Sequence, residues 1–304
     1  MTKNPRKSDA LPLPREILEE GKKILRRKGI PSPESEAEQL LSSVLGMKRH
    51  ELFLSSAKSI ERDKIELFFH LIEKRSEGVP SQYLLNSCEF MGYDFEVGPG
   101  VLVPRPETEI LVCEVVDEWK KSFRGGEAGG IVLDIGTGSG AIAISLALIL
   151  TGVKVVATEI SPTAILFAER NIVKHRLSSE KIRLCHGDLF QPVYEYRGKV
   201  WAVVSNPPYV KTHEIETLPV EVRDYEPRIA LDGGPDGLST IRKIIEGSAG
   251  FLVQDGILAL EIPGDSAGEV VSIARATGHF PDVRVVKDLA GRDRIVIARH
   301  GTGA

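Results

Sequence analysis

The strongest constraint on the fold of this chain is a regular alternation of two patterns that begins near residue 130. Short runs rich in Val and Ile are typical of buried strands, and between them apolar residues recur with helical spacing. Alternation of this kind predicts a mostly parallel sheet with helices on both faces. Ligands of such sheets bind beyond the carboxyl ends of the strands, where the strand order reverses.

The apolar runs and the residues that interrupt them set the expected boundaries. Strands are expected at 131–135, 153–158, 181–185, 200–205, 256–262, 283–287 and 294–298. Helices are expected between them, for example at 140–150 and 162–175. The predicted fold class is therefore α/β, with a mostly parallel, Rossmann-like sheet of seven strands.

The region before this sheet divides into a helical part and a connecting part. Residues 12–80 show helical periodicity and predict a small bundle, in which Ser32 caps a helix that Gly46 ends. The stretch 81–104 is rich in Gly, aromatic residues and Val, which favours a connecting hairpin. We therefore expect three parts: an N-terminal helical domain at 1–80 for substrate recognition, a hairpin linker at 81–104 and a ligand-binding domain at 105–304.

Charge narrows the class of partner. The chain has 39 basic and 43 acidic residues, and this net charge of −4 argues against a protein that coats nucleic acid. Residues 1–85 carry 16 basic and 13 acidic side chains, a net of +3, so the remainder carries −7. A mildly basic N-terminal part favours an acidic partner, although a difference this small is also typical of an ordinary solvated surface.

Cysteine spacing and hydropathy bear on the compartment. Cys88, Cys113 and Cys185 are scattered and form no CxxC pair, which argues against a disulfide framework and a zinc site. No apolar run approaches the length of a membrane span, and the N-terminus lacks the apolar stretch of a secretory signal. We expect a cytoplasmic enzyme without a metal and without a membrane partner.

Residues 131–148, IVLDIGTGSGAIAISLAL, combine a buried strand, a glycine-rich turn and an apolar helix. Gly136, Gly138 and Gly140 let the backbone turn tightly and let a ligand approach it closely, and the following helix N-terminus offers free N–H groups. With Ala141 the loop also satisfies the G-x-G-x-x-G/A pattern of dinucleotide-binding proteins. A third interpretation is that the glycines only permit close packing of helix and strand.

Asp134 argues against a dinucleotide as the ligand of this loop. A carboxylate two residues before the first glycine would repel a pyrophosphate but suits the ammonium group of a methionine moiety. The D-x-G-x-G-x-G form resembles motif I of S-adenosylmethionine (SAM) methyltransferases. The SAM contacts that this resemblance implies are Asp134, Gly136, Thr137, Gly138, Ser139 and Gly140.

Two further positions complete the expected nucleotide side. Glu159 ends the next strand, and its carboxylate can accept hydrogen bonds from ribose hydroxyls of either cofactor. Asp188 and Leu189 follow the third strand, where class I methyltransferases usually place an acid or amide near the adenine amino group. A simple turn cap is the alternative role of Asp188.

The fourth strand runs into Asn206-Pro207-Pro208-Tyr209. Pro207 disfavours helix for Asn206, and the two prolines fix φ and carry no N–H, so their carbonyls can act as acceptors. The side-chain oxygen of Asn206 and the carbonyl of Pro207 can then accept both hydrogens of a planar NH2 group, against which Tyr209 can stack. The fourth strand brings Asn206 to the same edge of the sheet as the glycine loop, and Asn206 is also expected as a SAM contact.

The chemistry that this arrangement suits is methyl transfer to nitrogen. The lone pair of an amide or aromatic amine is delocalised, and two fixed acceptors favour the charge that builds on nitrogen during attack. Fixed geometry also aligns the nitrogen with the sulfonium methyl group, so neither a metal nor a nucleophilic side chain is needed. The motif occurs in enzymes acting on exocyclic NH2 groups of bases and on glutamine amides, and it does not choose between them.

The chain as a whole resembles the PrmC/HemK family, the release-factor glutamine N5-methyltransferases. The resemblance rests on the N-terminal helical part, VPRPETE at 103–109, the glycine loop, SNPPYV, YEPRIALDGGPDGL at 225–238 and DLAGRDRIVIAR at 288–299. It implies a class I SAM-methyltransferase fold with the product S-adenosylhomocysteine. It also implies a substrate, the glutamine of the Gly-Gly-Gln loop in class 1 peptide release factors.

The resemblance assigns further residues and a partner. Asn206, Pro207, Pro208 and Tyr209 would bind the glutamine amide, and Phe90, Arg105 and Glu107 would line the substrate entrance. Pairing of Arg105 with Glu107 or Glu109 as a purely structural staple is the alternative. We expect a monomer whose partner is the release factor, with no direct contact to nucleic acid.

Some positions depart from the family pattern. Glu159 replaces the more usual Asp, and Leu189 stands where relatives often carry an aromatic residue. The loop 260–270 contains Pro263 and lacks the usual Gln, which leaves its role open. Three alternative functions remain: a ribosomal-protein glutamine methyltransferase, a nucleic-acid adenine N6-methyltransferase, and a nucleotide-binding module without catalysis.

Overall fold

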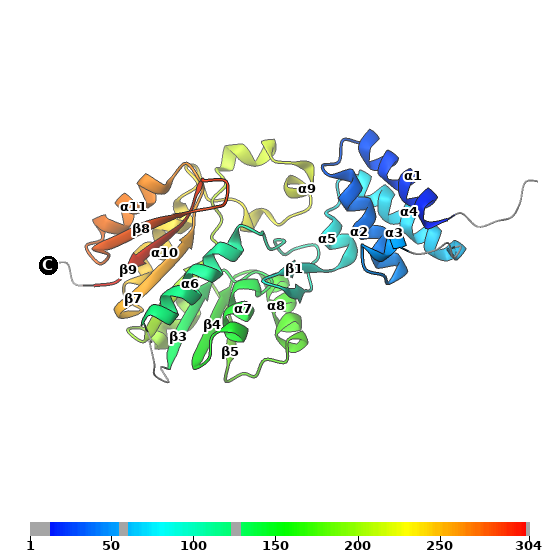
Figure 1. The fold of residues 1–304 in the computed structure, drawn as a ribbon. Helices are drawn as coiled ribbons and strands as arrows, with labels where there is room; N and C mark the ends of the chain where they lie inside the picture. The colour runs from blue at the N-terminus through cyan, green and yellow to red at the C-terminus, as the bar shows by residue number, and fades with distance from the viewer. Residues whose placement is uncertain (1–12, 55–59, 123–128, 302–304) are drawn as a thin grey trace, which may run out of the picture. The chain divides into compact units, whose positions relative to one another are not determined.

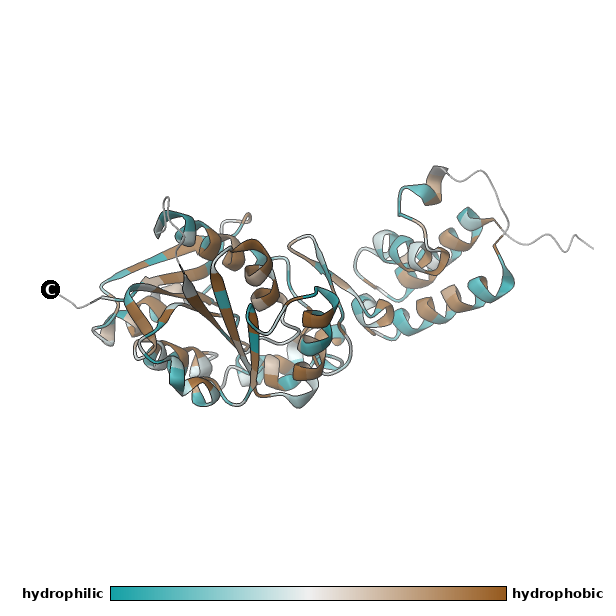
Figure 2. Ribbon diagram, turned by 90° about the horizontal axis from the view of Figure 1, so that it is seen from below, coloured by the Kyte–Doolittle hydropathy of each residue, from teal (hydrophilic) through white to brown (hydrophobic). Residues whose placement is uncertain are grey.

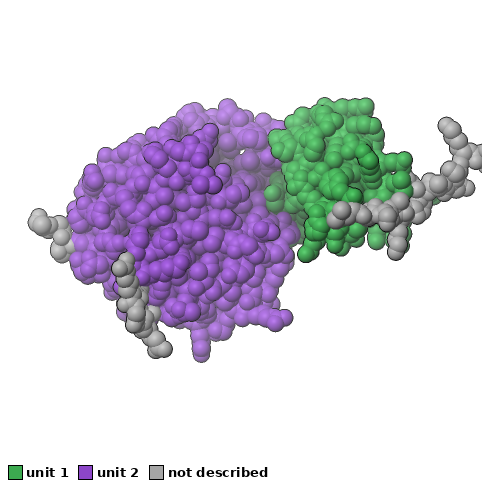
Figure 3. Space-filling model, in the orientation of Figure 1, with its two compact units in different colours: residues 1–86 green, residues 87–304 purple. Residues whose placement is uncertain are grey.

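The computed structural model describes residues 13–54, 60–122 and 129–301. The chain divides into two compact units, residues 1–86 and 87–304, which Figure 3 shows in different colours. The stretch 81–104, expected as a linker, is split by this division: its first residues belong to the first unit and its two short strands to the second.

The first unit is built from helices. They are α1 (Pro14–Arg27), α2 (Pro33–Leu45), α3 (Glu51–Leu54), α4 (Arg62–Ser76) and α5 (Ser81–Leu85). Leu25, Leu40, Phe68 and Ile72 are fully buried between them. A Cβ added at Gly21 would lie 2.6 Å from Cζ of Phe68, so α1 and α4 can pack this closely only because Gly21 has no side chain.

The predicted cap of α2 is wrong in its detail. Ser32 does precede the helix, but its backbone is left-handed, with φ 51° and ψ 49°, and its side chain accepts no hydrogen bond from the first turn. A capping serine needs an extended backbone to turn its hydroxyl toward the free N–H groups. Gly46 ends the helix in the left-handed conformation, as expected.

A short hairpin opens the second unit. Strands β1 (Cys88–Phe90) and β2 (Tyr93–Phe95) pair antiparallel, and Met91 and Gly92 between them both have positive φ. Two such residues are what a tight hairpin turn requires. Phe90 and Phe95 are buried in the core on one side of the large sheet, which anchors the hairpin beside the candidate site.

The second unit contains the predicted seven-stranded sheet (Figure 1). Its strands are β3 (Gly130–Ile135), β4 (Val153–Glu159), β5 (Ile182–His186), β6 (Val200–Ser205), β7 (Leu252–Glu261), β8 (Asp282–Lys287) and β9 (Asp293–Arg299). The order is β5-β4-β3-β6-β7-β9-β8, and β9 runs opposite to the other six strands. The strand order reverses at β3, between β4 and β6, so a ligand crevice is expected at the carboxyl ends of these strands.

Helices cover both faces of the sheet. On one face lie α6 (Thr108–Ser122), α7 (Ala141–Ile149) and α8 (Pro162–Lys174), and on the other lie η1 (Gln191–Tyr196), α10 (Ser239–Ser248) and α11 (Ala267–Ala276). Hydrophobic residues concentrate in the strands and on the helix sides that meet them (Figure 2). Three short helices, η2 (Thr212–Thr217), α9 (Val220–Arg223) and η3 (Arg228–Ala230), lie in the long segment between β6 and α10.

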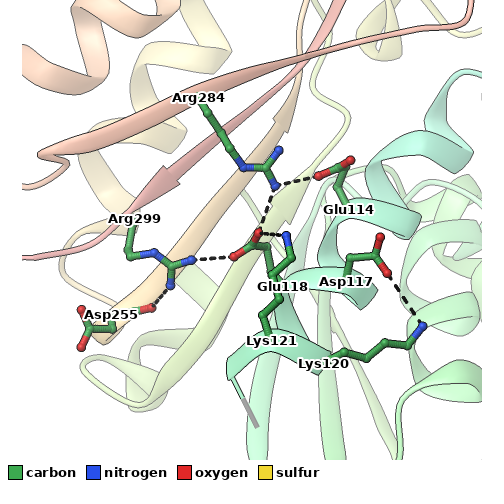
Figure 4. A network of polar contacts seen from close by, with 8 residues as sticks. All are labelled: Glu114, Asp117, Glu118, Lys120, Lys121, Asp255, Arg284 and Arg299. Atoms are coloured by element: carbon green, nitrogen blue, oxygen red, sulfur yellow. Dashed lines mark hydrogen bonds and ion pairs between the residues drawn. The ribbon is translucent and has the colours of Figure 1, made fainter. Parts of the chain in front are cut away.

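A buried acid ties α6 to the antiparallel edge of the sheet. Glu118 is 4% exposed, and its carboxylate accepts from Lys121 on its own helix, Arg284 on β8 and Arg299 on β9 (Figure 4). Burial alone would raise the pKa of Glu118, but these three cations lower it below its ordinary value. The network therefore keeps a buried carboxylate ionised and fixes α6, whose first residue reaches the candidate site.

None of the helices within the described ranges combines the length and the apolar composition that crossing a membrane requires.

Candidate active site

A cavity lies at the carboxyl ends of the central strands, and its lining comes entirely from the second unit. The glycine loop after β3, the ends of β4 and β5 and the segment after β6 form most of it. The β1 strand, the segment 100–108, the loop 227–230 and the start of α10 complete the wall. This is the crevice that the strand order predicts.

The glycine loop is shaped by its backbone. Gly136, Gly138 and Gly140 all have positive φ, at 72°, 58° and 85°. The N–H groups of Gly136 and Thr137 both donate to the carbonyl of Thr158 on β4, over 2.9 and 3.0 Å. The loop is therefore tied to the neighbouring strand and leads directly into α7.

Glu159 holds the loop from the other side. One carboxylate oxygen accepts from the N–H of Gly138 over 2.8 Å, and the other accepts from the N–H of Ser161 over the same distance. The residue is 8% exposed and lines the cavity. Each oxygen retains a further lone pair, so the carboxylate can still accept from ligand hydroxyls.

Asp134 does not lie where the motif predicts a ligand contact. Its side chain is fully buried, accepts from the hydroxyl of Thr137 over 2.6 Å, and is not part of the cavity lining. Burial raises the pKa of Asp134 to about 7. The carboxyl group sits beneath the loop rather than in the cavity, because β3 directs it into the layer between sheet and helices.

The turn after β5 reaches the cavity as expected. Asp188 is exposed and Leu189 half-buried, and both line the wall together with Gly187. Leu189 has a φ of 46°, an uncommon value for a branched residue. The turn therefore adopts one specific conformation rather than an extended continuation of β5.

Asn206, Pro207 and Pro208 line the same cavity from the end of β6. The Nδ2 group of Asn206 donates to the hydroxyl oxygen of Thr108, the first residue of α6, over 3.0 Å. This bond leaves the side-chain carbonyl oxygen of Asn206 available as an acceptor.

Tyr209 lies differently from the prediction. It is not among the lining residues, and its hydroxyl donates to Glu261 at the end of β7 over 3.1 Å. Burial and the adjacent carboxylate raise the pKa of Tyr209, so the phenol stays protonated and remains a donor. The hydroxyl bond holds the ring of Tyr209 beside the cavity.

Two residues of this site escaped the sequence analysis. Glu261 is 1% exposed and accepts from Thr108 as well as from Tyr209, the former over 2.6 Å. Burial raises the pKa of Glu261 above its ordinary value. The acidic residue that follows the apolar run 257–260 of β7 was a usable signal, and Thr108 stands within the VPRPETE segment.

The residues expected at the substrate entrance do not all line the cavity. Phe90 lines the cavity, whereas Arg105 and Glu107 do not, although their neighbours Pro104 and Thr108 do. The expected pairing of Arg105 with Glu107 or Glu109 is wrong. Arg105 instead forms an ion pair with Glu226, because the segment after β6 folds back over this stretch.

Residues that could hold a metal do not gather in the described part of the chain, where no group of three or more His, Cys, Asp and Glu side chains has suitable geometry. Cys88 and Cys185 are buried and Cys113 is exposed. Burial raises the pKa of Cys88 to about 11, so its thiol is not an activated nucleophile. The polar groups around the cavity suit binding and positioning.

Known proteins resemble this chain along most of its length. A family model described as PrmC N-terminal domain matches residues 16–85, and one described as methyltransferase small domain matches residues 110–221. The release factor glutamine methyltransferase of Moorella thermoacetica is 40% identical over 287 residues, covering 93% of this chain and 97% of that protein. The enzyme of the same name from Geobacter sulfurreducens is 38% identical, covering 94% and 96%.

A solved structure shares the sheet domain. The T. thermophilus 16S rRNA N2 G1207 methyltransferase (RsmC), in complex with AdoMet and guanosine, has a TM-score of 0.51 and is 19% identical, covering 70% of this chain and 49% of that one. At this identity the likeness concerns the methyltransferase fold alone. The curated relatives are more similar and are covered almost completely. Their identity and coverage show that the chain belongs to the release factor glutamine methyltransferase family.

Proposed function

We propose that this protein transfers a methyl group from SAM to the side-chain amide nitrogen of a glutamine, the one in the Gly-Gly-Gln loop of class 1 peptide release factors. One observation carries the proposal. Asn206 and Pro207 stand in the wall of the cavity that the glycine loop also lines, and the Nδ2 group of Asn206 is already bonded to Thr108. A pair of fixed acceptors beside a cofactor loop fits a planar NH2 group, and the family membership specifies glutamine.

The residues of the nucleotide side fit SAM. A Cβ at Gly136 would have no atom within 4 Å, so the backbone is open to a ligand there. Glu159 would accept from the ribose hydroxyls, and Asp188 and Leu189 would border the adenine. When bound, SAM supplies an electrophilic methyl group on a positively charged sulfur.

The residues of the amide side hold the nucleophile. The Oδ1 atom of Asn206 and the carbonyl of Pro207 would each accept one hydrogen of the glutamine NH2 group. These acceptors favour the positive charge that develops on nitrogen and keep its lone pair directed at the methyl group. After transfer the nitrogen proton is acidic and leaves to water, so no basic side chain has to take it.

The test is methyl transfer to competing substrates. Purified protein is incubated with methyl-labelled SAM and, separately, a class 1 release factor, its Gly-Gly-Glu variant, ribosomal proteins and nucleic acids. We expect label in the unchanged release factor only, and its loss with the Asn206→Ala enzyme. Label in ribosomal protein or nucleic acid but not in the release factor would overturn the proposal.

A further inference from the structure

We propose that Thr108 and Glu261 are positioning residues that fix which way the Asn206 side-chain amide faces. Asn206 lines the cavity, whereas Glu261 lies behind it, and a relay of hydrogen bonds connects the two through Thr108. The catalytic consequence rests on the proposed function, because it concerns the acceptor that Asn206 offers to a substrate NH2 group.

The relay has a fixed direction of donation. Asn206 Nδ2 donates to Thr108 Oγ1 over 3.0 Å, and Thr108 Oγ1 donates to Glu261 Oε2 over 2.6 Å. A hydroxyl has one proton to give, and a carboxylate can only accept. With Glu261 ionised, its carboxylate accepts the hydrogen bond of the Thr108 hydroxyl, so Thr108 can only accept from whatever atom faces it.

This direction selects one of the two orientations of the amide. If the side chain of Asn206 were turned by 180°, its oxygen would face a hydroxyl oxygen without a free proton. The cavity would then present an NH2 donor to the NH2 group of a substrate, and neither could accept. The relay excludes that orientation and presents Oδ1 to the cavity.

The same carboxylate also holds the other end of the motif. Glu261 Oε1 accepts from the hydroxyl of Tyr209 over 3.1 Å, so one carboxyl group fixes Asn206 through Thr108 and Tyr209 directly. Thr108 is 4% exposed and Glu261 1%, which keeps water from replacing either bond. The three elements involved are the start of α6 and the ends of β6 and β7.

The kinetic test compares two substitutions of one side chain. Thr108→Val keeps the shape and removes the hydroxyl, whereas Thr108→Ser keeps the hydroxyl. We expect kcat for the release factor to fall about 10- to 100-fold in Thr108→Val, as misplacement of a reacting group does. Thr108→Ser should retain kcat within about threefold. Because Thr108 lines the cavity, kcat is measured at saturating SAM in all three proteins. Equal kcat in wild type and Thr108→Val, or equal losses in both variants, would overturn the proposal.

A second measurement is independent of the substrate. The side-chain NH2 signals of Asn206, identified by their absence in Asn206→Ala, report on its orientation in nuclear magnetic resonance spectra. We expect one of its protons to exchange slowly with water in wild type and Thr108→Ser but rapidly in Thr108→Val. Identical exchange in all three proteins would refute the relay. If it is observed in a protein that methylates no release factor, the positioning stands and the proposed function fails.

Discussion

At the scale of single residues, the site depends on buried carboxyl groups that have different partners. Glu159 accepts two backbone N–H groups, Glu261 accepts two hydroxyls, and Asp134 accepts one hydroxyl. Bonds to the ionised form oppose the effect of burial. Burial nevertheless raises the pKa of both Glu261 and Asp134. Around Asp134, burial outweighs the bonds from the Thr137 side chain and the Ala143 backbone and raises its pKa to about 7.

The raised pKa of Asp134 predicts that Asp134→Asn changes the stability of the protein in a pH-dependent way. The pKa of Asp134 is raised from 3.8 to about 7 in the folded protein, so its favourable contribution is full below about pH 4 and is lost as pH rises through 7. An Asn cannot ionise, and it still accepts from Thr137. In the absence of ligand, the free energy of unfolding of wild type relative to Asp134→Asn should fall by up to about 4 kcal/mol between pH 4 and pH 8.

Denaturant titrations of both proteins at several pH values measure this directly. Other titrating groups are common to the two proteins and cancel in the difference. Parallel stability curves would show that the carboxyl group titrates normally. The affinity for SAM should change little, because Asp134 does not line the cavity, and a large loss would restore the ammonium contact that the sequence motif predicts.

Glu159→Gln gives a second prediction at this scale. A Gln has one acceptor oxygen, so its NH2 group would face the N–H of either Gly138 or Ser161, and one backbone donor would lose its partner. We expect a destabilisation of about 1–3 kcal/mol and weaker SAM binding by about tenfold or more. Scanning calorimetry measures the stability, and titration calorimetry measures the affinity for SAM. An unchanged affinity would contradict the role given to Glu159. Glu159→Asp serves as the matched control, because it keeps the charge.

At the scale of elements, the ion pair of Arg105 and Glu226 joins two segments that meet over the cavity. The side chain of Glu226 is 1% exposed, and that of Arg105 is 33% exposed. Burial raises the pKa of Glu226, so the carboxylate depends on its partner to stay ionised. The pair therefore connects the segment before α6 with the segment between β6 and α10.

Removing Arg105 alone should lower the free energy of unfolding more than removing both charges of the pair. Arg105→Met leaves a buried carboxylate without its partner, and we expect a destabilisation of about 2–4 kcal/mol at neutral pH. The double variant Arg105→Met with Glu226→Gln should recover part of that loss. Denaturant titrations of the wild type, the double variant and the two single variants, Arg105→Met and Glu226→Gln, provide a double-mutant cycle. Additive effects would mean that the two side chains do not interact.

What the sequence could predict at this scale follows from the range of the interactions. The glycine loop and the motif at Asn206 come directly after buried strands, so strand periodicity alone brings them to one edge of the sheet. The bonds of Thr108 with Glu261 and of Arg105 with Glu226 span 153 and 121 residues along the chain. The first pairing depends on where the start of α6 meets the end of β7, and the second on how the long segment after β6 folds back. Local sequence patterns carry no information on either. The prediction that Ser32 caps α2 was wrong for a local reason, because the backbone of Ser32 is left-handed.

At the scale of the whole molecule, the two units divide the expected work. Every residue of the cavity wall belongs to the second unit, and the first unit contributes a helical bundle with its own core. Residues 1–85 carry a net charge of +3 and the rest of the chain −7. We propose that the first unit contacts the body of the release factor, while the second binds SAM and the glutamine.

Deletion of residues 1–86 tests this division. We expect SAM binding to persist, methylation of the intact release factor to fall by about tenfold or more, and methylation of a short Gly-Gly-Gln peptide to change little. Circular dichroism checks that the shortened protein is folded. In the full chain, Arg27→Glu with Lys28→Glu reverses two exposed charges and should raise KM for the intact factor only. Unchanged turnover in both variants would contradict a docking role.

The most direct test of the account is the position of the transferred methyl group. Tandem mass spectrometry of the release factor after incubation with SAM and the wild-type protein should show one added methyl group, on the side-chain amide nitrogen of the Gly-Gly-Gln glutamine. The same experiment with Asn206→Ala should show that peptide unmodified. A methyl group on another residue, or equal modification by Asn206→Ala, would contradict the claim that Asn206 and Pro207 hold a glutamine amide for methylation.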